Sequence, residues 1–131
     1  MTDFISDDEL LARYITSSRW YRKSDQTVKP DAFVPPEDPL ELSTTRHLNL
    51  SEDRIWDIGQ KIATGQSRNL HGRADIKVLH VILQSLSVVS DPTLCNPNHA
   101  NIIKWPDKKN ARKLLALELA KNACFLANPD Q

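Results

Sequence analysis

The chain has 131 residues, of which 40% are hydrophobic and 26% are charged. This composition is typical of one globular domain with its own core, and it excludes an intrinsically disordered chain. No apolar stretch has the length of a membrane span, and the acidic N-terminus is unlike a secretory signal peptide. We therefore expect a single domain over residues 1–131 in the cytoplasm, with no membrane association and with both cysteines reduced.

The formal net charge is zero, but the charge is unevenly distributed along the chain. Residues 1–65 contain 8 Lys/Arg and 12 Asp/Glu, whereas residues 66–131 contain 9 and 5, so the halves carry −4 and +4. A nucleic-acid binder usually has a larger basic excess with aromatic residues interleaved in it. Nucleic acid is therefore not a favoured partner.

The first third of the chain predicts one helix and one long loop. Ser6 followed three residues later by Glu9 is a capping-box pattern, and it predicts a helix over residues 7–17. The apolar residues of that segment fall on one helical face. Four prolines within residues 24–39 disfavour an interior strand or helix there. Phe33 and Val34 are expected to pin this Pro-rich segment to the body as a wrapped loop.

The middle of the chain predicts a strand, a helix and one ambiguous segment. Residues 40–47 alternate between apolar and polar residues and include β-favouring threonines, which indicates a strand. Ser51 opens a helix that Gly65 closes. Residues 74–86 fit a strand by their period of two and a helix by their apolar face, so both interpretations stay open. A further strand is expected through Val88 and Val89.

The last third predicts a loop, a strand and a helix. Asp91 to Asn98 has loop chemistry, with two prolines beside Asp and Asn. A strand is expected from His99 to Trp105, followed by a helix over 108–126 that Asp107 caps, with Cys124 in the core. Together these elements predict an α+β fold in which three or four helices pack on a small, mainly antiparallel sheet.

The tripeptide His71-Gly72-Arg73 is a candidate anion site. Glycine lets a ligand approach the backbone closely, and histidine and arginine are suited to binding phosphate or carboxylate. The alternative is a plain turn with two solvated polar side chains.

A second group of candidate residues follows from the loop before His99. Asn96 and Asn98 are expected to turn their side chains onto the backbone and fix the imidazole of His99. Arg46 shares the register of core-facing leucines and therefore needs a carboxylate or an anionic ligand. Acidic residues of the first half of the chain are the alternative partners for Arg46. His71 and His99 are the candidates for acid–base catalysis.

Trp20, Tyr21 and Arg22 form a candidate surface for a protein partner, because grouped aromatic and arginine residues dominate interface energies. The alternative is that Trp20 and Tyr21 cover the helix predicted over residues 7–17. Zinc sites usually combine two pairs of closely spaced ligands, and the sequence offers only the pair Cys95 and His99. We therefore expect no metal site and no cofactor.

Two functional hypotheses follow. The first is a small cytosolic binding or interaction domain for a protein partner or a small anionic ligand. The second is a small enzyme or nucleotide-binding protein that acts on a phosphorylated substrate. In the second hypothesis, arginines hold the phosphate and one imidazole acts as general acid or base. The sequence leaves open whether the chain is an enzyme.

Overall fold

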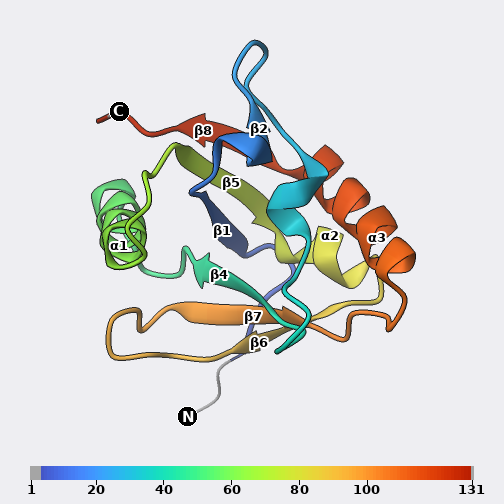
Figure 1. Ribbon diagram of the computed structural model, residues 1–131. Coiled ribbons are helices and arrows are strands. Elements are labelled where there is room, and N and C mark those ends of the chain that lie inside the picture. Colours follow the sequence, from blue (N-terminus) through green and yellow to red (C-terminus); the bar gives the residue numbers. More distant parts are fainter. Residues whose placement is uncertain (1–3, 131) are drawn as a thin grey trace.

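The computed structural model describes residues 4–130, in which a six-stranded sheet carries helices on both faces (Figure 1). The strand order is β6-β7-β4-β1-β5-β8, and every neighbouring pair is antiparallel. The elements in chain order are β1 (Leu10–Ile15), β2 (Tyr21–Arg22), β3 (Thr27–Val28), β4 (Leu42–Arg46), α1 (Glu52–Gly65), β5 (Gly72–Lys77), α2 (Val78–Ile82), β6 (Ser87–Ser90), β7 (His99–Ile103), α3 (Lys109–Asn122) and β8 (Cys124–Ala127). The predicted α+β fold with a mainly antiparallel sheet is confirmed, with three α-helices in the described residues.

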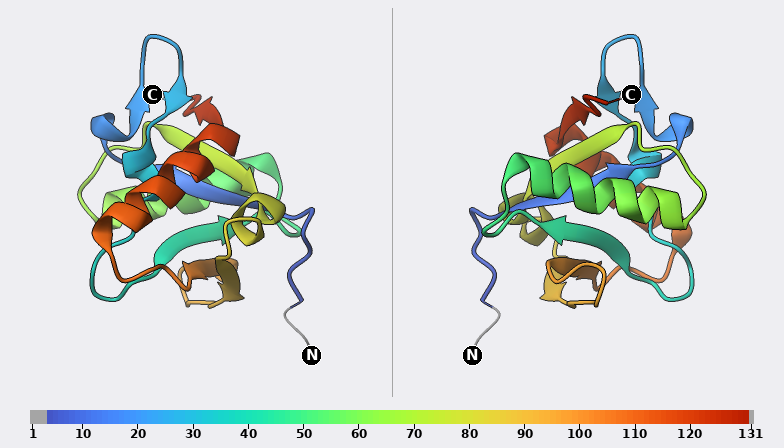
Figure 2. Two further views of the ribbon diagram at one scale, coloured as in Figure 1. Left: turned by 90° about the vertical axis from the view of Figure 1, so that its right-hand side faces the viewer. Right: turned by 90° about the vertical axis from the view of Figure 1, so that its left-hand side faces the viewer.

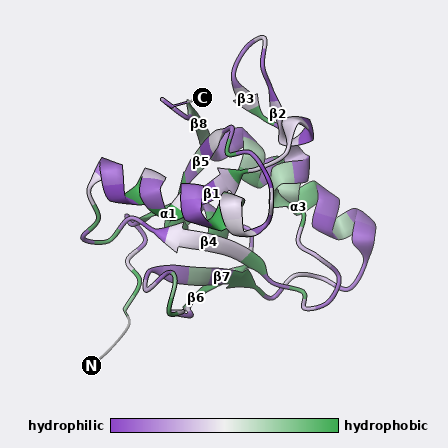
Figure 3. Ribbon diagram, turned by 60° about the vertical axis from the view of Figure 1, so that its left-hand side comes forward, coloured by the Kyte–Doolittle hydropathy of each residue, from purple (hydrophilic) through white to green (hydrophobic). Residues whose placement is uncertain are grey.

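The alternation of side chains along β1 divides the interior into two cores. Leu11 and Ile15 face the core that α3, α2 and the 3-10 helix Pro30–Phe33 cover, whereas Ala12 and Tyr14 face α1. Figure 2 shows α3 across one face of the sheet and α1 across the other. In Figure 3, hydrophilic residues follow the loop between β2 and β3, and α3 carries both kinds of residue. Buried residues of the two cores include Phe33, Ile76, Trp105 and Leu119 on one face and Tyr14, Ile55 and Ile58 on the other.

The helix predicted over residues 7–17 is wrong, because residues 10–15 form the central strand β1. Ser6 makes only a turn, in which its carbonyl accepts from the Glu9 amide and its hydroxyl accepts from the Asp8 amide. A strand buried on both faces has few polar residues to mark its period. Such a short apolar run cannot be distinguished from a helix by periodicity.

The predicted strand over residues 40–47 is confirmed as β4, and the predicted helix after Ser51 is confirmed as α1. The Ser51 hydroxyl accepts a hydrogen bond from the Arg54 amide, which satisfies one free donor of the first turn. The ambiguous segment 74–86 contains both structures, since β5 runs to Lys77 and the short helix α2 begins at Val78. The strands expected near Val88 and after His99 are present as β6 and β7.

The last predicted helix is too long, because α3 ends at Asn122 and residues 124–127 form the edge strand β8. Cys124 lies on this edge and is exposed, so its expected place in the core is wrong. Asp107 does not cap α3 with its side chain. Instead, the buried Arg112 turns back and donates to the carbonyls of Pro106 and Asp107.

Within the Pro-rich segment 24–39, residues 27–28 form the strand β3 and Pro30–Phe33 form a 3-10 helix. Phe33 is buried in the core on the α3 side of the sheet, and Val34 packs against the same core. None of the helices between residues 4 and 130 combines the length and the apolar character that crossing a membrane requires.

Candidate anion-binding site

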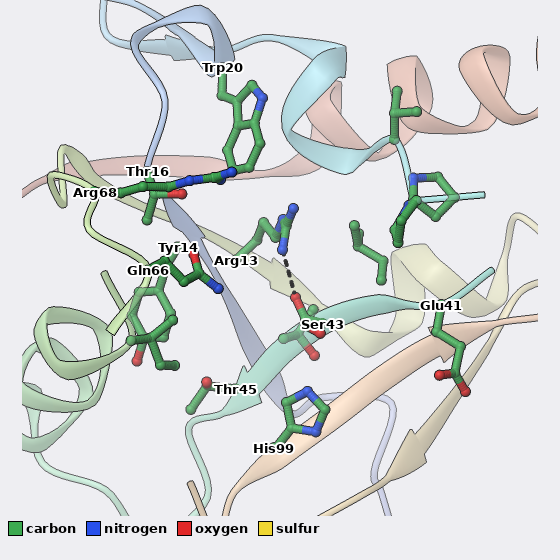
Figure 4. Close-up of a pocket in the computed structure, with 16 residues that line it drawn as sticks. Arg13, Tyr14, Thr16, Trp20, Glu41, Ser43, Thr45, Gln66, Arg68 and His99 are labelled. Atoms are coloured by element: carbon green, nitrogen blue, oxygen red, sulfur yellow. Dashed lines mark hydrogen bonds between the residues drawn. The ribbon is translucent and has the colours of Figure 1, made fainter. Parts of the chain in front are cut away.

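A cleft lies where β1 and β4 cease to pair. The ladder between these strands contains only the pairs Leu11–Arg46 and Ala12–Thr45, whereas β1 pairs with β5 through six residues. The second half of β1 and the first half of β4 line a cleft with a volume of about 500 Å³. The Arg13 side chain crosses toward β4 at this point (Figure 4).

Arg13 is held in the cleft by neutral partners. Its Nε donates to the carbonyl of Ala32 at 2.7 Å, and its Nη1 donates to the carbonyl of Ser43 at 3.1 Å. The guanidinium carbon also lies 5.0 Å from the centre of the Trp20 ring. These contacts orient the guanidinium, but the two carbonyls and the indole ring are neutral groups and do not cancel its positive charge.

Arg68 reaches the same cleft from the loop that follows α1. Ser67 adopts a positive φ of 57°, and the Arg68 amide donates to the carbonyl of Ala63, so the chain turns sharply after the helix. Burial lowers the pKa of Arg13 to about 10, and the charge of Arg68 contributes to this lowering. Within residues 4–130, no carboxylate forms an ion pair with either arginine. The two cations therefore repel each other, and an anion between them would relieve that repulsion.

The cleft continues into a second hollow of about 560 Å³. Thr16, Trp20 and Arg68 line both hollows, so the two form one trough. His99 lines the first hollow and His71 lines the second. The remaining polar lining residues are Ser17, Ser18, Arg19, Asp31, Glu41, Ser43, Thr44, Thr45, Gln66 and Asn69, together with Arg13 and Tyr14.

The orientation of His99 is set by Asp91. The Nδ1 atom of His99 lies 2.8 Å from the carbonyl oxygen of Asp91 and 3.5 Å from a carboxylate oxygen of the same residue. A carbonyl oxygen can only accept, so Nδ1 carries a proton and Nε2 is the free acceptor of the neutral ring. The lone pair at Nε2 is what a general base requires.

The asparagines beside His99 act on the backbone, as the sequence predicts. The Asn98 amide nitrogen donates to the carbonyls of Arg46 and Leu48, and the Asn96 side chain accepts from the Asn98 amide. Asn98 therefore orders the loop rather than lining the trough. Arg46 is buried and paired with Glu9, so an acidic residue of the first half is its partner.

Arg73 lies away from the trough, on the α1 side of the sheet. It is 1% exposed and is bound by Asp75 and Glu52, with its guanidinium over the Trp56 ring at 4.7 Å. Gly72 has a packing role, because a Cβ at this position would overlap the Leu126 carbonyl of β8. The structure thus brings His71 and His99 to one trough and places Arg46, Gly72 and Arg73 outside it.

The three residues of the candidate partner surface, Trp20, Tyr21 and Arg22, have different surroundings. Trp20 lines the trough, and the Tyr21 ring stacks on Phe125 at 4.9 Å and lies 5.5 Å from the His71 ring. Arg22 is exposed and lies 3.8 Å from Asp25. Trp20 and Tyr21 also pack against the core on the α3 side of the sheet, which gives them a structural role. Their binding of a protein partner stays a prediction.

Sequence reasoning missed Arg13 and Arg68. A helix over residues 7–17 gives Arg13 no special place, and Arg68 stands in an unremarkable loop. A strand interpretation of residues 10–15 finds Arg13, since it then shares a face with Leu11 and Ile15. A charged side chain between two buried apolar ones is unfavourable unless it has a partner, so it marks a candidate functional residue.

Comparisons with models of known protein families, with curated proteins and with solved structures found no match to this chain. Between residues 4 and 130, no group of three or more His, Cys, Asp or Glu side chains is arranged to hold a metal ion.

Proposed function

We propose that this chain is a binding domain for a small phosphorylated compound, which it holds in the trough between Arg13 and Arg68. One observation carries the proposal: Arg13 is desolvated, lies beside a second cation and has no carboxylate partner within the described residues. Such an arrangement is costly in the empty protein and becomes favourable when an anion enters.

Phosphate is the anion that suits these side chains. A guanidinium presents several donors in a fixed plane, which match the oxygens of a phosphate group. The two positive charges of the arginines match the two negative charges of a phosphate group, whereas a single carboxylate would neutralise only one of the arginines. The second hollow offers room for an organic group beyond the phosphate, and its Asn69 and His71 side chains supply polar contacts.

The test is an NMR titration of the full chain with inorganic phosphate and, separately, with adenosine monophosphate. We expect amide shifts at residues 13–20 and 66–71, and tighter binding of the nucleotide than of phosphate. Arg68→Ala should weaken binding at least about tenfold, since it removes a charge-assisted hydrogen bond. Arg54→Ala changes another exposed arginine, on α1, and should leave binding unchanged. Equal affinities for both variants would contradict the proposal.

A second candidate function is hydrolysis of a phosphate ester, and the hydrogen bond from His99 to the Asp91 carbonyl favours it. In this reaction Nε2 of His99 takes a proton from water while the water oxygen bonds to phosphorus. The ester oxygen then leaves with that proton, and Arg13 and Arg68 stabilise the negative charge on the non-bridging oxygens of the phosphoryl group.

This candidate is tested with p-nitrophenyl phosphate and bis(p-nitrophenyl) phosphate as substrates. Slow release of p-nitrophenol that His99→Gln abolishes, with phosphate binding retained, would support catalysis. Turnover that is absent from the native chain, or unchanged in the variant, would leave binding as the only function proposed for the trough.

A further inference from the structure

A second surface of the molecule has a groove along α3, and only Asp31 and Val34 of the Pro-rich segment line both this groove and the trough. The first part of the groove lies between α3 and the 3-10 helix Pro30–Phe33 and has a volume of about 490 Å³. The second part lies between the end of α3 and β3 and has a volume of about 460 Å³. Pro30 and Leu117 line both parts, so the two parts adjoin, and we refer to them together as the groove.

The floor of this groove is apolar although it faces solvent. Leu114 is 66% exposed and Leu117 is 38% exposed, and both face the groove beside Pro30 and Val34. Figure 2 (left) shows the outer side of α3 uncovered by any other element of the described chain. Large apolar side chains gathered in a groove, rather than scattered, indicate a surface that a partner covers.

The rim of the groove is basic. Lys113 and Lys121 line it on α3, and Lys108 and Lys109 are exposed where the helix begins. Asp31 is the acidic residue that lines it, and Glu118 pairs with Lys121 at 3.3 Å. Within residues 4–130, Lys113 forms no ion pair. Lys108, Lys109, Lys113 and Lys121 carry four positive charges against the two negative charges of Asp31 and Glu118, so the net charge of these residues is +2, and the excess lies toward the start of α3.

We propose that this groove, lined by Leu114, Leu117, Pro30 and Val34 and bordered by Lys113 and Lys121, binds an acidic segment of a partner protein. The apolar floor takes one or two anchoring side chains of the segment, and the lysines face its carboxylates. Asn110 and Lys121 are eleven residues apart on α3, which spans about 16 Å. Three turns of an amphipathic helix match that length.

The test is a selection from a display library of random 14-residue peptides against the full native chain. The double variant Lys113→Glu/Lys121→Glu serves as the counter-target, and its fold is verified by circular dichroism. We expect the peptides that prefer the native chain to be acidic, with apolar residues three or four positions apart. Basic or neutral winners, or no preference for the native chain, would overturn the proposal.

A second measurement fixes the place of binding. A fluorescein-labelled winner should bind the native chain with an affinity that falls as salt is raised. Lys113→Glu should weaken it about tenfold, whereas Lys61→Glu on α1 should not. Amide shifts are expected along α3 at Lys113, Leu114 and Leu117, none of which lines the trough. Shifts confined to the trough would overturn the proposal, as would binding to anionic lipid vesicles that is as tight as binding to the peptide.

Discussion

The guanidinium of Arg73 and the carboxylate of Asp75 are joined by three hydrogen bonds of 3.0–3.2 Å on the α1 side of β5. The same carboxylate lies 3.0 Å from Nε2 of His47, and Glu52 holds the other side of the guanidinium. These contacts raise the pKa of Arg73 against the opposing effect of its burial. Asp75 is thus the anion that makes a buried arginine tolerable in the core.

Removing that anion should destabilise the fold. Asp75→Asn leaves Arg73 buried beside a neutral amide, and we expect the free energy of unfolding to fall by about 3 kcal/mol. Urea denaturation followed by circular dichroism measures the change. Asp53→Asn is the control, since Asp53 is exposed in the first turn of α1 and its loss should cost below about 1 kcal/mol. Similar losses for both variants would show that the Arg73 charge is compensated elsewhere.

Tyr14 should make stability sensitive to alkaline pH. Its hydroxyl donates to the carbonyl of Ile55 at 2.5 Å, and burial raises its pKa to about 12. The unfolded tyrosine loses its proton near pH 10, so between about pH 10 and 12 the unfolded state binds fewer protons. The contribution of Tyr14 to stability is therefore present below about pH 10 and is lost as the pH rises to about 12.

The variant Tyr14→Phe isolates this effect. We expect it to be less stable than the native chain at pH 7 by about 1–2 kcal/mol, because the Ile55 carbonyl loses its donor. The difference should shrink between about pH 10 and 12. Arg13 titrates in the same range with the opposite sign, since its lowered pKa makes the folded state lose the proton first. Only the difference between the two proteins reports on Tyr14, and a difference that is constant with pH would contradict the raised pKa.

Gly72 should not tolerate a side chain. A methyl group there would overlap the Leu126 carbonyl and the Phe125 ring, so Gly72→Ala forces β5 and β8 apart. We expect a loss of about 1–3 kcal/mol from overpacking. At Gly65 no atom lies within 4 Å of the place that a methyl group would take, and φ is not positive, so Gly65→Ala should be neutral or slightly stabilising. Thermal unfolding distinguishes the two variants, and equal melting temperatures would contradict the overlap.

The first turn of α3 should be open to stabilisation. It has no acidic residue and no side-chain cap, and Lys109 places a positive charge at the positive end of the helix dipole. Lys109→Glu should raise the free energy of unfolding by about 0.3–1 kcal/mol, an effect that fades at high salt. Lys109→Gln, which removes the charge without reversing it, should give a smaller gain. A gain that is unchanged in high salt would point to packing instead.

The sequence predicted elements with clear end signals and missed those without them. Ser51 caps the start of α1 and the prolines of the 91–98 loop separate β6 from β7, so local chemistry alone predicted these boundaries. The end of α1 was predicted at the right place, although the left-handed residue that turns the chain there is Ser67 and not Gly65. The sequence around β1 contains no comparable start or stop signal. The partners of a central strand lie in distant parts of the chain, so local sequence does not reveal them. β8 was merged with α3 because nothing in the apolar residues 123–126 separates helix from strand.

The candidate site was harder to predict than the fold because pairing in space decides which cations are available. Arg46 and Arg73 each stand close to a histidine in the sequence, but Glu9 and Asp75 neutralise them in the structure. Arg13 has no charged neighbour in the sequence, and its charge becomes significant only when β1 is placed beside β4.

The interrupted ladder between β1 and β4 makes the sheet two three-stranded halves joined by a narrow seam. One half is β6-β7-β4 and the other is β1-β5-β8, with two residue pairs and the Arg13 bridge to Ser43 between them. The ligand proposed for the trough would contact residues of both halves and so connect them across the seam. Binding of that ligand would then reduce the motion of the two halves relative to each other, and the effect would extend to the edge strands β6 and β8.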